Sequence, residues 1–304
     1  GVFAWVATIW TGRPVFNTPF LFFASFIILF TIGGVSGYMT GSVPVDWQLT
    51  DTYFIVAHIH YVLIGINVFP VVGAVYFWFP KFTGKMMGER LGRWNFWTMF
   101  IGFNLGFFPM HISGLLGMPR RVYTYADGMG WDWLNFITTL GSFAFAIGVL
   151  LFIVNVALSY RRGRTAGNNP WDAPTLEWAT TSPPPPYNFV VIPTVASRHP
   201  LWEGRLGEPD SHEHSYVNAG LVLDQGRDTV GTTPRDAQPD ISLKMPKDSF
   251  APVILAIALT AIFIGLVLHI WWLAVLGGLA TGVDIIGWLW PERSLGETAE
   301  PANG

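Results

Sequence analysis

The fold is decided by the stretch Asp51-Thr52-Tyr53-Phe54-Ile55-Val56-Ala57-His58-Ile59-His60-Tyr61, which begins a long run without a charged residue before Lys81. An α-helix turns by about 100° per residue, so His58 and His60 point to nearly opposite faces of one helix. They cannot easily share one metal ion. We expect each imidazole to hold its own metal or haem with the helix between the two, which is a geometry typical of electron transfer.

A structural role is the alternative for these histidines. A single histidine inside an apolar helix is more often a structural residue with satisfied hydrogen bonds than a ligand. Two imidazoles in one apolar span are different, because ionisable groups at membrane depth are expensive, about 2.5–3.5 kcal/mol for Arg, Lys or Asp, and are functional by default. The pair therefore favours metal or haem binding.

The composition is that of a membrane protein. Of the 304 residues, 51% are hydrophobic and 12% are charged, which is typical of helices that bury apolar surface against lipid and against each other. The chain has no cysteine, which excludes disulfides and thiolate metal sites. Its net charge of −3 is too small to suggest a nucleic-acid partner. The first residue is not an initiator and no signal segment follows it, so we expect the later part of a longer protein.

Hydropathy predicts an all-α, polytopic transmembrane bundle. We expect the end of a helix at residues 1–10, a turn at Gly12-Arg13-Pro14, and uncharged spans bounded by charges, Gly or Pro. The uncharged spans are residues 16–38, 52–80, 94–118 and 133–160, and two shorter apolar spans follow at 250–268 and 271–290. The expected domains are a transmembrane bundle at 1–164, a cytoplasmic segment at 165–249 and a transmembrane hairpin with its tail at 250–304.

Basic residues give the orientation. Four of them lie in the connection that follows residue 80, and three more follow the span that ends near Tyr160, so both points are expected on the cytoplasmic side. These residues are Lys81, Lys85, Arg90, Arg93, Arg161, Arg162 and Arg164. The loop at 41–51, which carries Asp46 and Asp51 without a basic residue, then lies outside, and so do Arg120 and Arg121.

The segment between the bundle and the hairpin is rich in Pro, Asp, Thr and Ser, including Pro183-Pro184-Pro185-Pro186, and we expect it to be partly extended. Its His212-Glu213-His214 could bind a metal, but such residues in a soluble segment are more often simply solvated. The hairpin fits either an accessory element similar to a small oxidase subunit or a structural filler in lipid. Asp284 within it is expected at a helix contact or near water.

Several motifs in this sequence resemble those of a known protein family. The run from Thr52 to Leu63 resembles the haem-binding helix of subunit I of haem–copper terminal oxidases of the cytochrome c oxidase type. Further matches follow in the family's order and extend over about residues 1–190. They are Val2-Phe3 with Trp5, Phe107-Phe108-Pro109 with His111, Gly117-Met118-Pro119-Arg120-Arg121, and Trp171-Asp172 through Leu176-Glu177-Trp178.

The resemblance implies the C-terminal part of a twelve-helix subunit. By it, His58 is the axial ligand of a high-spin haem where oxygen binds, and His60 is one of two axial ligands of a low-spin haem, both of the a type. Arg120 and Arg121 would bind haem propionates, because guanidinium groups pair bidentately with carboxylates. Snorkelling to lipid headgroups is the alternative for these arginines. The copper ligands and the cross-linked tyrosine of the family would lie outside this chain.

Two positions depart from the family. Asp46 and Asp51 are expected near the propionates, and Asp51 is a candidate magnesium ligand, but the family's histidine before it is replaced here by Thr50. The family's lysine before the Val-Phe pair is replaced by Gly1, so the proton route differs or the first residue is not the native one.

The resemblance thus implies part of a subunit I in a bacterial cytoplasmic membrane. With subunits II and III it would oxidise cytochrome c, reduce O₂ to water and translocate protons. A quinol-oxidising relative is the close alternative. A non-catalytic channel or transporter with a histidine proton relay is another, which would show no visible absorbance, and a structural fragment without cofactor is a third.

Overall fold

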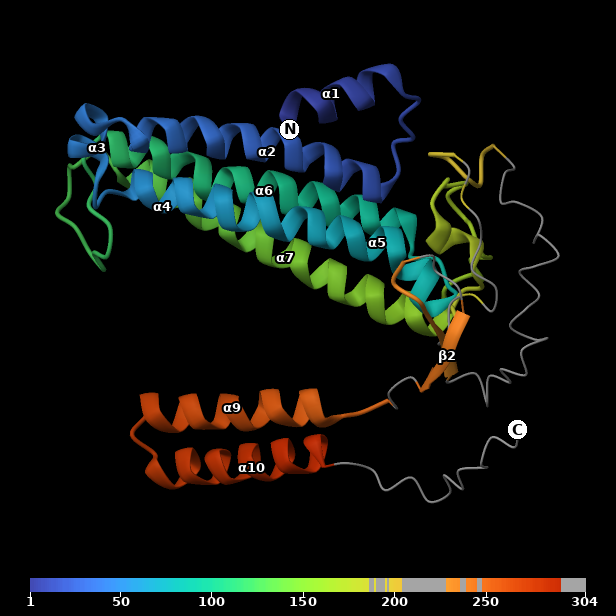
Figure 1. The fold of residues 1–304 in the computed structure, drawn as a ribbon. Helices are drawn as coiled ribbons and strands as arrows, with labels where there is room; N and C mark the ends of the chain where they lie inside the picture. Colours follow the sequence, from blue (N-terminus) through green and yellow to red (C-terminus); the bar gives the residue numbers. More distant parts are fainter. Residues whose placement is uncertain are drawn as a thin grey trace, which may run out of the picture. The chain divides into compact units, whose positions relative to one another are not determined.

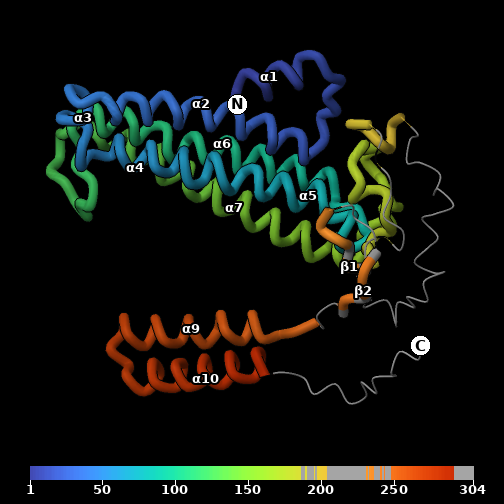
Figure 2. Tube along the Cα trace, viewed as in Figure 1, coloured from blue at the N-terminus to red at the C-terminus, as the bar shows by residue number. Residues whose placement is uncertain are grey.

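Helices dominate both compact units of the chain, Gly1–Leu221 and Val222–Gly304. The computed structural model describes residues 1–185, 189, 195, 197–203, 228–235, 239–244 and 248–290 (Figures 1 and 2). The metal-binding candidate His212-Glu213-His214 lies outside these described residues.

The first unit contains the predicted bundle. Its helices are α1 (Val2–Thr11), α2 (Thr18–Gly41), α3 (Val43–Leu49), α4 (Tyr53–His60), the π-helical segment η1 (Tyr61–Val68), α5 (Phe69–Thr83), α6 (Glu89–Leu115), α7 (Asp132–Arg162) and the short 3₁₀ helix η2 (Leu176–Ala179). The short helix α3 was not predicted. Elsewhere in the bundle the expected spans form helices whose ends differ from the prediction by a few residues.

Four spans among the described residues are long and apolar enough to cross a membrane: Thr18–Gly41, Tyr53–Thr83, Asp132–Arg162 and Trp271–Leu289. The predicted span 94–118 forms α6, which has 27 residues but is not one of these four. Its first turn carries Glu89, Arg90 and Arg93, and its interior contains asparagines and a histidine, which lower its hydropathy. The all-α membrane architecture is therefore confirmed, with one of its central helices more polar than the rest.

Helix α6 packs against α7, α4 and α2, and Figure 1 shows these helices side by side. The α6–α7 contact is unusually close because glycines face it from both sides. A Cβ atom on Gly141 would overlap the backbone of Leu105 and Gly106, and one on Gly102 would overlap the backbone at Ala144 and Phe145. Small residues that allow such approach are characteristic of helix pairs in membranes, where lipid supplies no hydrophobic drive for association.

Side-chain hydrogen bonds join helices at one end of the bundle. The Asn155 amide donates to the Tyr76 hydroxyl at 3.0 Å, and that hydroxyl donates to Asn95 Oδ1 at 3.1 Å. Asn155 Oδ1 also accepts from Ser159 Oγ and from the backbone N–H of Gly88. All four side chains are buried. Buried polar groups are tolerable there because their hydrogen-bonding capacity is used.

The two ends of the bundle are tied by short backbone contacts between loops. Thr52 and Pro119 form an isolated bridge at one end, and Lys85 and Thr165 form another at the opposite end. The loops at 41–52 and 116–121 therefore share one end, and residues 81–93 and 161–164 share the other, as the charge pattern predicted. Which end faces the cytoplasm stays a prediction.

Lys81 departs from the expected role of a loop charge. It lies in the last turn of α5, is 7% exposed, and donates from Nζ to the carbonyl oxygens of Asn168 at 3.2 Å, Thr180 at 2.9 Å and Thr181 at 3.3 Å. Three acceptors use the three hydrogens of an ammonium group. Lys81 therefore fastens the segment after α7 onto the end of α5.

Tryptophans complete this docking. Trp171 donates from Nε1 to the carbonyl of Phe77 at 2.8 Å and stacks on its ring, and Trp178 meets the same ring edge-on while being 1% exposed. The start of the segment expected to be extended, residues 165–185, is thus held against the bundle by specific contacts.

The second unit adds two elements to the prediction. Strands β1 (Asp228–Thr232) and β2 (Pro239–Lys244) pair antiparallel, with Asp228 opposite Lys244 and a shift in register at Gly231 and Thr232. They fall within the range 165–249, which was expected to be partly extended and for which no strand was predicted. Sequence alternation there is too short to have indicated a hairpin.

The predicted C-terminal hairpin is formed by α9 (Ala251–Val267) and α10 (Trp271–Leu289). Gly265 packs against the backbone of Ala274, and Gly277 packs against Ala258 and Ile262. His269 adopts a positive φ of 57° in the tight turn between the helices. Asp284 lies in α10 with its Oδ2 buried and without a hydrogen-bond partner among the described residues.

The α6–α7 contact generates the first prediction. Gly141→Ala should destabilise the chain by about 1–3 kcal/mol, because the added methyl group forces two tightly packed helices apart. Thermal unfolding followed by circular dichroism in detergent measures this. The matched control is Gly34→Ala, since a Cβ there meets nothing within 4 Å. Equal melting temperatures for the two variants would contradict the close packing described here.

A second prediction concerns the buried side chain of Lys81. Lys81→Met should raise the rate of chymotrypsin cleavage after Trp171 and Trp178 by about tenfold or more, because each hydrogen bond to a charged group contributes about 1.5–3 kcal/mol. Lys85→Met is the control, since Lys85 Nζ donates to the carbonyls of Tyr160 and Arg161 at the end of α7 instead. Similar cleavage rates in both variants would show that Lys81 does not hold the segment.

Candidate functional site

The histidine pair lies at the point where one transmembrane span changes its helical geometry. Helix α4 begins after Thr52, whose Oγ1 accepts from the backbone N–H of Phe54, and it ends at His60. The π-helical segment η1 follows directly from Tyr61. Such segments are frequent at functional sites. His58 and His60 themselves remain in α-helical backbone, so the angular offset expected from the sequence applies to them.

His58 faces α2. Its Nδ1 lies 3.0 Å from Oγ of Ser36, which also donates to the carbonyl of Gly33 at 3.0 Å. A Cβ atom on Gly37 would lie 2.9 Å from Cε1 of His58, so any larger residue at this position would push the ring from its present place. The imidazole is half-buried, and its Nε2 makes no hydrogen bond with a described residue.

His60 faces α6. Its Nδ1 lies 2.7 Å from the carbonyl oxygen of Val56, one turn earlier in the same helix, and its ring stacks on Phe107 with centroids 4.3 Å apart. A carbonyl can only accept, so Nδ1 carries the hydrogen and Nε2 keeps its lone pair. The two imidazoles therefore contact different helices, which is the divergent arrangement that their spacing predicts.

This donor set fits haem iron. A histidine ligand binds metal through a neutral ring nitrogen while its other nitrogen is hydrogen-bonded to a carbonyl or similar partner, which fixes the orientation of the ring. Both histidines engage Nδ1 in this way and leave Nε2 free. Among the described residues no group of three or more His, Asp or Glu side chains is close enough to hold a metal ion alone.

His111 is a third imidazole near the pair. It is 7% exposed, meets the ring of Phe54 edge-on, and lies with its ring centroid 5.4 Å from that of Tyr61. Its Nδ1 is 3.3 Å from the carbonyl of Phe108, and its Nε2 is buried without a described partner. In the sequence, His111 is recognisable only as the last residue of the motif Phe107-Phe108-Pro109-Met110-His111. Its distance along the chain from His58 gives no indication that the two lie near each other.

The loop end of the bundle brings Asp51 and Arg120 together. Their side chains form an ion pair, and the backbone N–H of Arg120 donates to the carbonyl of Asp51 at 2.8 Å. Asp51 adopts a positive φ of 58°, which turns the chain from α3 into α4. The carboxylate of Asp51 therefore pairs with Nη2 of the Arg120 guanidinium, while Arg120 Nε is buried without a described partner.

The other predicted residues of this end are not gathered into that pair. Arg121 is exposed and has a positive φ of 66°. Asp46 is half-buried within α3, and Thr50 is exposed just after that helix. A magnesium site at Asp51 and propionate binding by Arg121 or Asp46 thus remain predictions from the resemblance.

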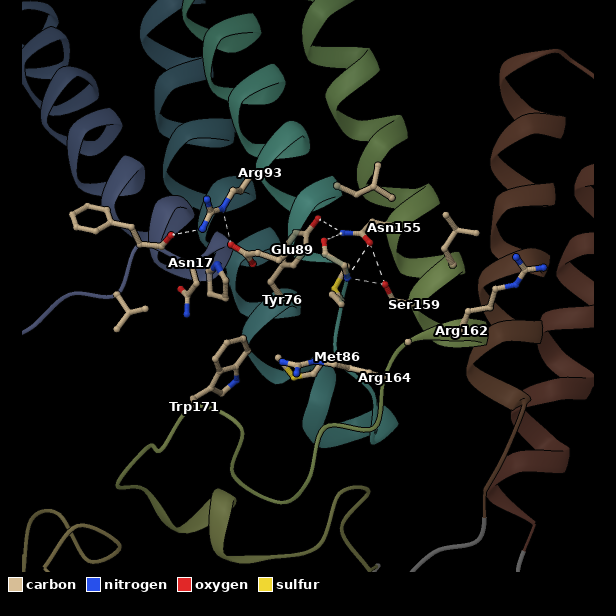
Figure 3. A pocket seen from close by; sticks show the side chains of 18 residues that line it. Asn17, Tyr76, Met86, Glu89, Arg93, Asn155, Ser159, Arg162, Arg164 and Trp171 are labelled. Atoms are coloured by element: carbon tan, nitrogen blue, oxygen red, sulfur yellow. Dashed lines mark hydrogen bonds and ion pairs between the residues drawn. The ribbon is translucent and has the colours of Figure 1, made fainter.

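A cavity of about 780 Å³ lies at the opposite end of the bundle (Figure 3). Figure 3 shows the Glu89–Arg93 ion pair, the Asn155–Ser159 pair and Trp171 around it. None of the predicted site residues lines this cavity. The histidines and the cavity are therefore separate features.

Comparison with known proteins agrees with the motifs. Residues 1–144 match the family model described as cytochrome c and quinol oxidase polypeptide I. Cytochrome c oxidase subunit 1 of Alkalihalophilus pseudofirmus is 40% identical over 92% of this chain and 42% of its own length. A probable cytochrome c oxidase subunit 1-beta of Nocardia farcinica is 47% identical over 74% of the chain and 38% of its length.

A quinol-oxidising relative is also similar. Quinol oxidase subunit 1 of Bacillus subtilis is 37% identical over 91% of the chain and 39% of its own length. Coverage of more than nine-tenths of the chain carries the similarity well past residue 190, so the end expected from the motifs was too early. The chain spans about two fifths of the length of these relatives. It belongs, through the region that carries both histidines, to the family of cytochrome c and quinol oxidase polypeptide I.

Proposed function

We propose that this chain supplies the haem-ligating part of a cytochrome c oxidase subunit I. The complete enzyme would take electrons from reduced cytochrome c, reduce O₂ to water and couple this to proton translocation. The observation that carries the proposal is the pair of divergent imidazoles on one membrane-length span, each with Nδ1 engaged and Nε2 free.

The two histidines have different roles in this proposal. His58 would hold the haem at which oxygen is reduced, and His60 would hold the haem that transfers electrons to it. The contact of His58 with Ser36 of α2 fixes the orientation of its ring and therefore of Nε2. The ring of His60 is restrained on the α6 side, where it stacks on Phe107. The backbone between the two ligands is short and rigid, which fixes the relative placement of whatever they hold.

The loop residues are proposed to hold the anionic edges of the cofactors. Arg120 and Arg121 would bind haem propionates, with Asp46 near the same groups. Arg120 is preorganised, because Asp51 holds its guanidinium while Nε remains available as a donor. Asp51 is also proposed as a magnesium ligand. In the Arg120–Asp51 ion pair, Arg120 would then contact a propionate and Asp51 would contact the magnesium ion.

The remaining cofactor and partner assignments follow from the family. We propose two haems of the a type, a copper centre whose ligands are not among the histidines assigned here, and assembly with subunits II and III in a bacterial cytoplasmic membrane. Cytochrome c is preferred over quinol as the donor because the two relatives named for it are more similar to this chain than the quinol oxidase. Oxidase activity of the purified complex with each reductant separates these donors.

Substitution of the ligands tests the proposal. In the full-length complex, His58→Ala should abolish the carbon monoxide-induced change in the reduced visible spectrum, because it removes the imidazole proposed to hold the carbon monoxide-reactive haem. His60→Ala should perturb the low-spin bands and slow electron entry while the high-spin haem remains.

The control is His269→Ala, which removes an imidazole from the α9–α10 turn. Its spectra should match those of the unsubstituted complex. If His58→Ala and His60→Ala both left both sets of bands unchanged, the ligand assignment would be wrong.

A further inference from the structure

Ser36 contacts the ring of His58 from a neighbouring helix. It lies in α2, is 4% exposed, and its Oγ is 3.0 Å from His58 Nδ1 and 3.0 Å from the carbonyl of Gly33. Glycine at position 37 leaves the ring its space beside this hydroxyl. The side chain of Ser36 is therefore aimed at one atom of one candidate ligand.

The count of hydrogens determines the direction of these bonds. A serine hydroxyl has one hydrogen and two lone pairs, and a backbone carbonyl has no hydrogen to give. Both contacts form together only when the hydroxyl donates to Gly33 and Oγ accepts from an Nδ1–H of His58. That tautomer leaves the lone pair on Nε2, which is the nitrogen a haem iron requires.

The two histidines are oriented by different groups. His60 gives its Nδ1 hydrogen to the carbonyl of Val56, which belongs to its own helix and is retained whatever side chain stands at 56. His58 depends on a side chain in another helix, 22 positions away in sequence. A substitution can therefore remove the partner of His58 and leave that of His60 unchanged.

We propose that Ser36 is a positioning residue for the oxygen-reactive haem: its hydroxyl fixes the tautomer and the ring orientation of His58 and strengthens the electron donation of Nε2 to iron. This inference rests on the proposed function and extends it to a residue outside the haem-binding helix. Hydrogen bonding at the second nitrogen of a ligating imidazole raises its basicity, so loss of the hydroxyl weakens the iron–histidine bond.

The test uses resonance Raman spectroscopy of the reduced full-length complex, in which the iron–histidine stretching band reports this bond. Ser36→Ala should move the band to lower wavenumber and raise the midpoint potential of the carbon monoxide-reactive haem, while the low-spin bands stay in place. Ser36→Thr, which keeps the hydroxyl, should restore the unsubstituted frequency.

The matched control is Ser25→Ala. Ser25 lies in the same helix, is 2% exposed, and donates to the carbonyl three residues earlier at 2.8 Å, as Ser36 does, but its hydroxyl is not bonded to a described histidine. Its Raman band should not move. If Ser36→Ala fails to assemble, Ser36→Cys provides a weaker acceptor of similar volume and should shift the band in the same direction.

The outcomes separate the two proposals. A complex whose high-spin haem depends on His58, but whose band is the same in Ser36→Ala or Ser36→Cys as in Ser25→Ala, overturns the role of Ser36 and leaves the proposed function intact. A complex with no haem bands, or with bands indifferent to His58→Ala, overturns the proposed function itself.

Discussion

The arrangement depends on a helix that must present two imidazoles in opposite directions inside a packed bundle. His58 is held by a hydroxyl of α2, and the ring of His60 stacks on Phe107 of α6, so both contacts require a neighbouring helix to approach closely. Glycines permit this approach. Gly37 of α2 leaves room for the His58 ring, and a Cβ atom on Gly114 of α6 would overlap the backbone at Phe54. These glycines therefore allow α2 and α6 to pack close to the helix that carries the two histidines.

The separation of the two imidazoles also bears on mechanism. A proton relay needs groups that hydrogen-bond in series, but His58 bonds toward α2 and His60 bonds to its own helix. No described hydrogen bond connects them. Each ring is oriented independently, which suits two ligands for two cofactors better than two members of one relay. Membership of the oxidase family points the same way.

Much of the fold could be predicted from the sequence, because apolar spans bounded by charges have few alternatives in a membrane. The spacing of His58 and His60 was enough to predict that their side chains point to nearly opposite faces of the helix. Contacts between distant segments could not be predicted. Lys81 looked like a loop charge, although tertiary packing buries it under the segment at 168–181. Ser36 carries no signal of its own, since a serine in a helix is usually bonded to its own backbone.

The central claim is that one span holds two haems of different coordination. The most direct measurement is the reduced-minus-oxidised visible spectrum of the purified full-length complex, recorded with and without carbon monoxide and combined with haem quantification. We expect two haems per subunit I, with carbon monoxide shifting the bands of one and leaving those of the other in place. A spectrum without haem bands, or one in which carbon monoxide shifts both haems, would contradict it.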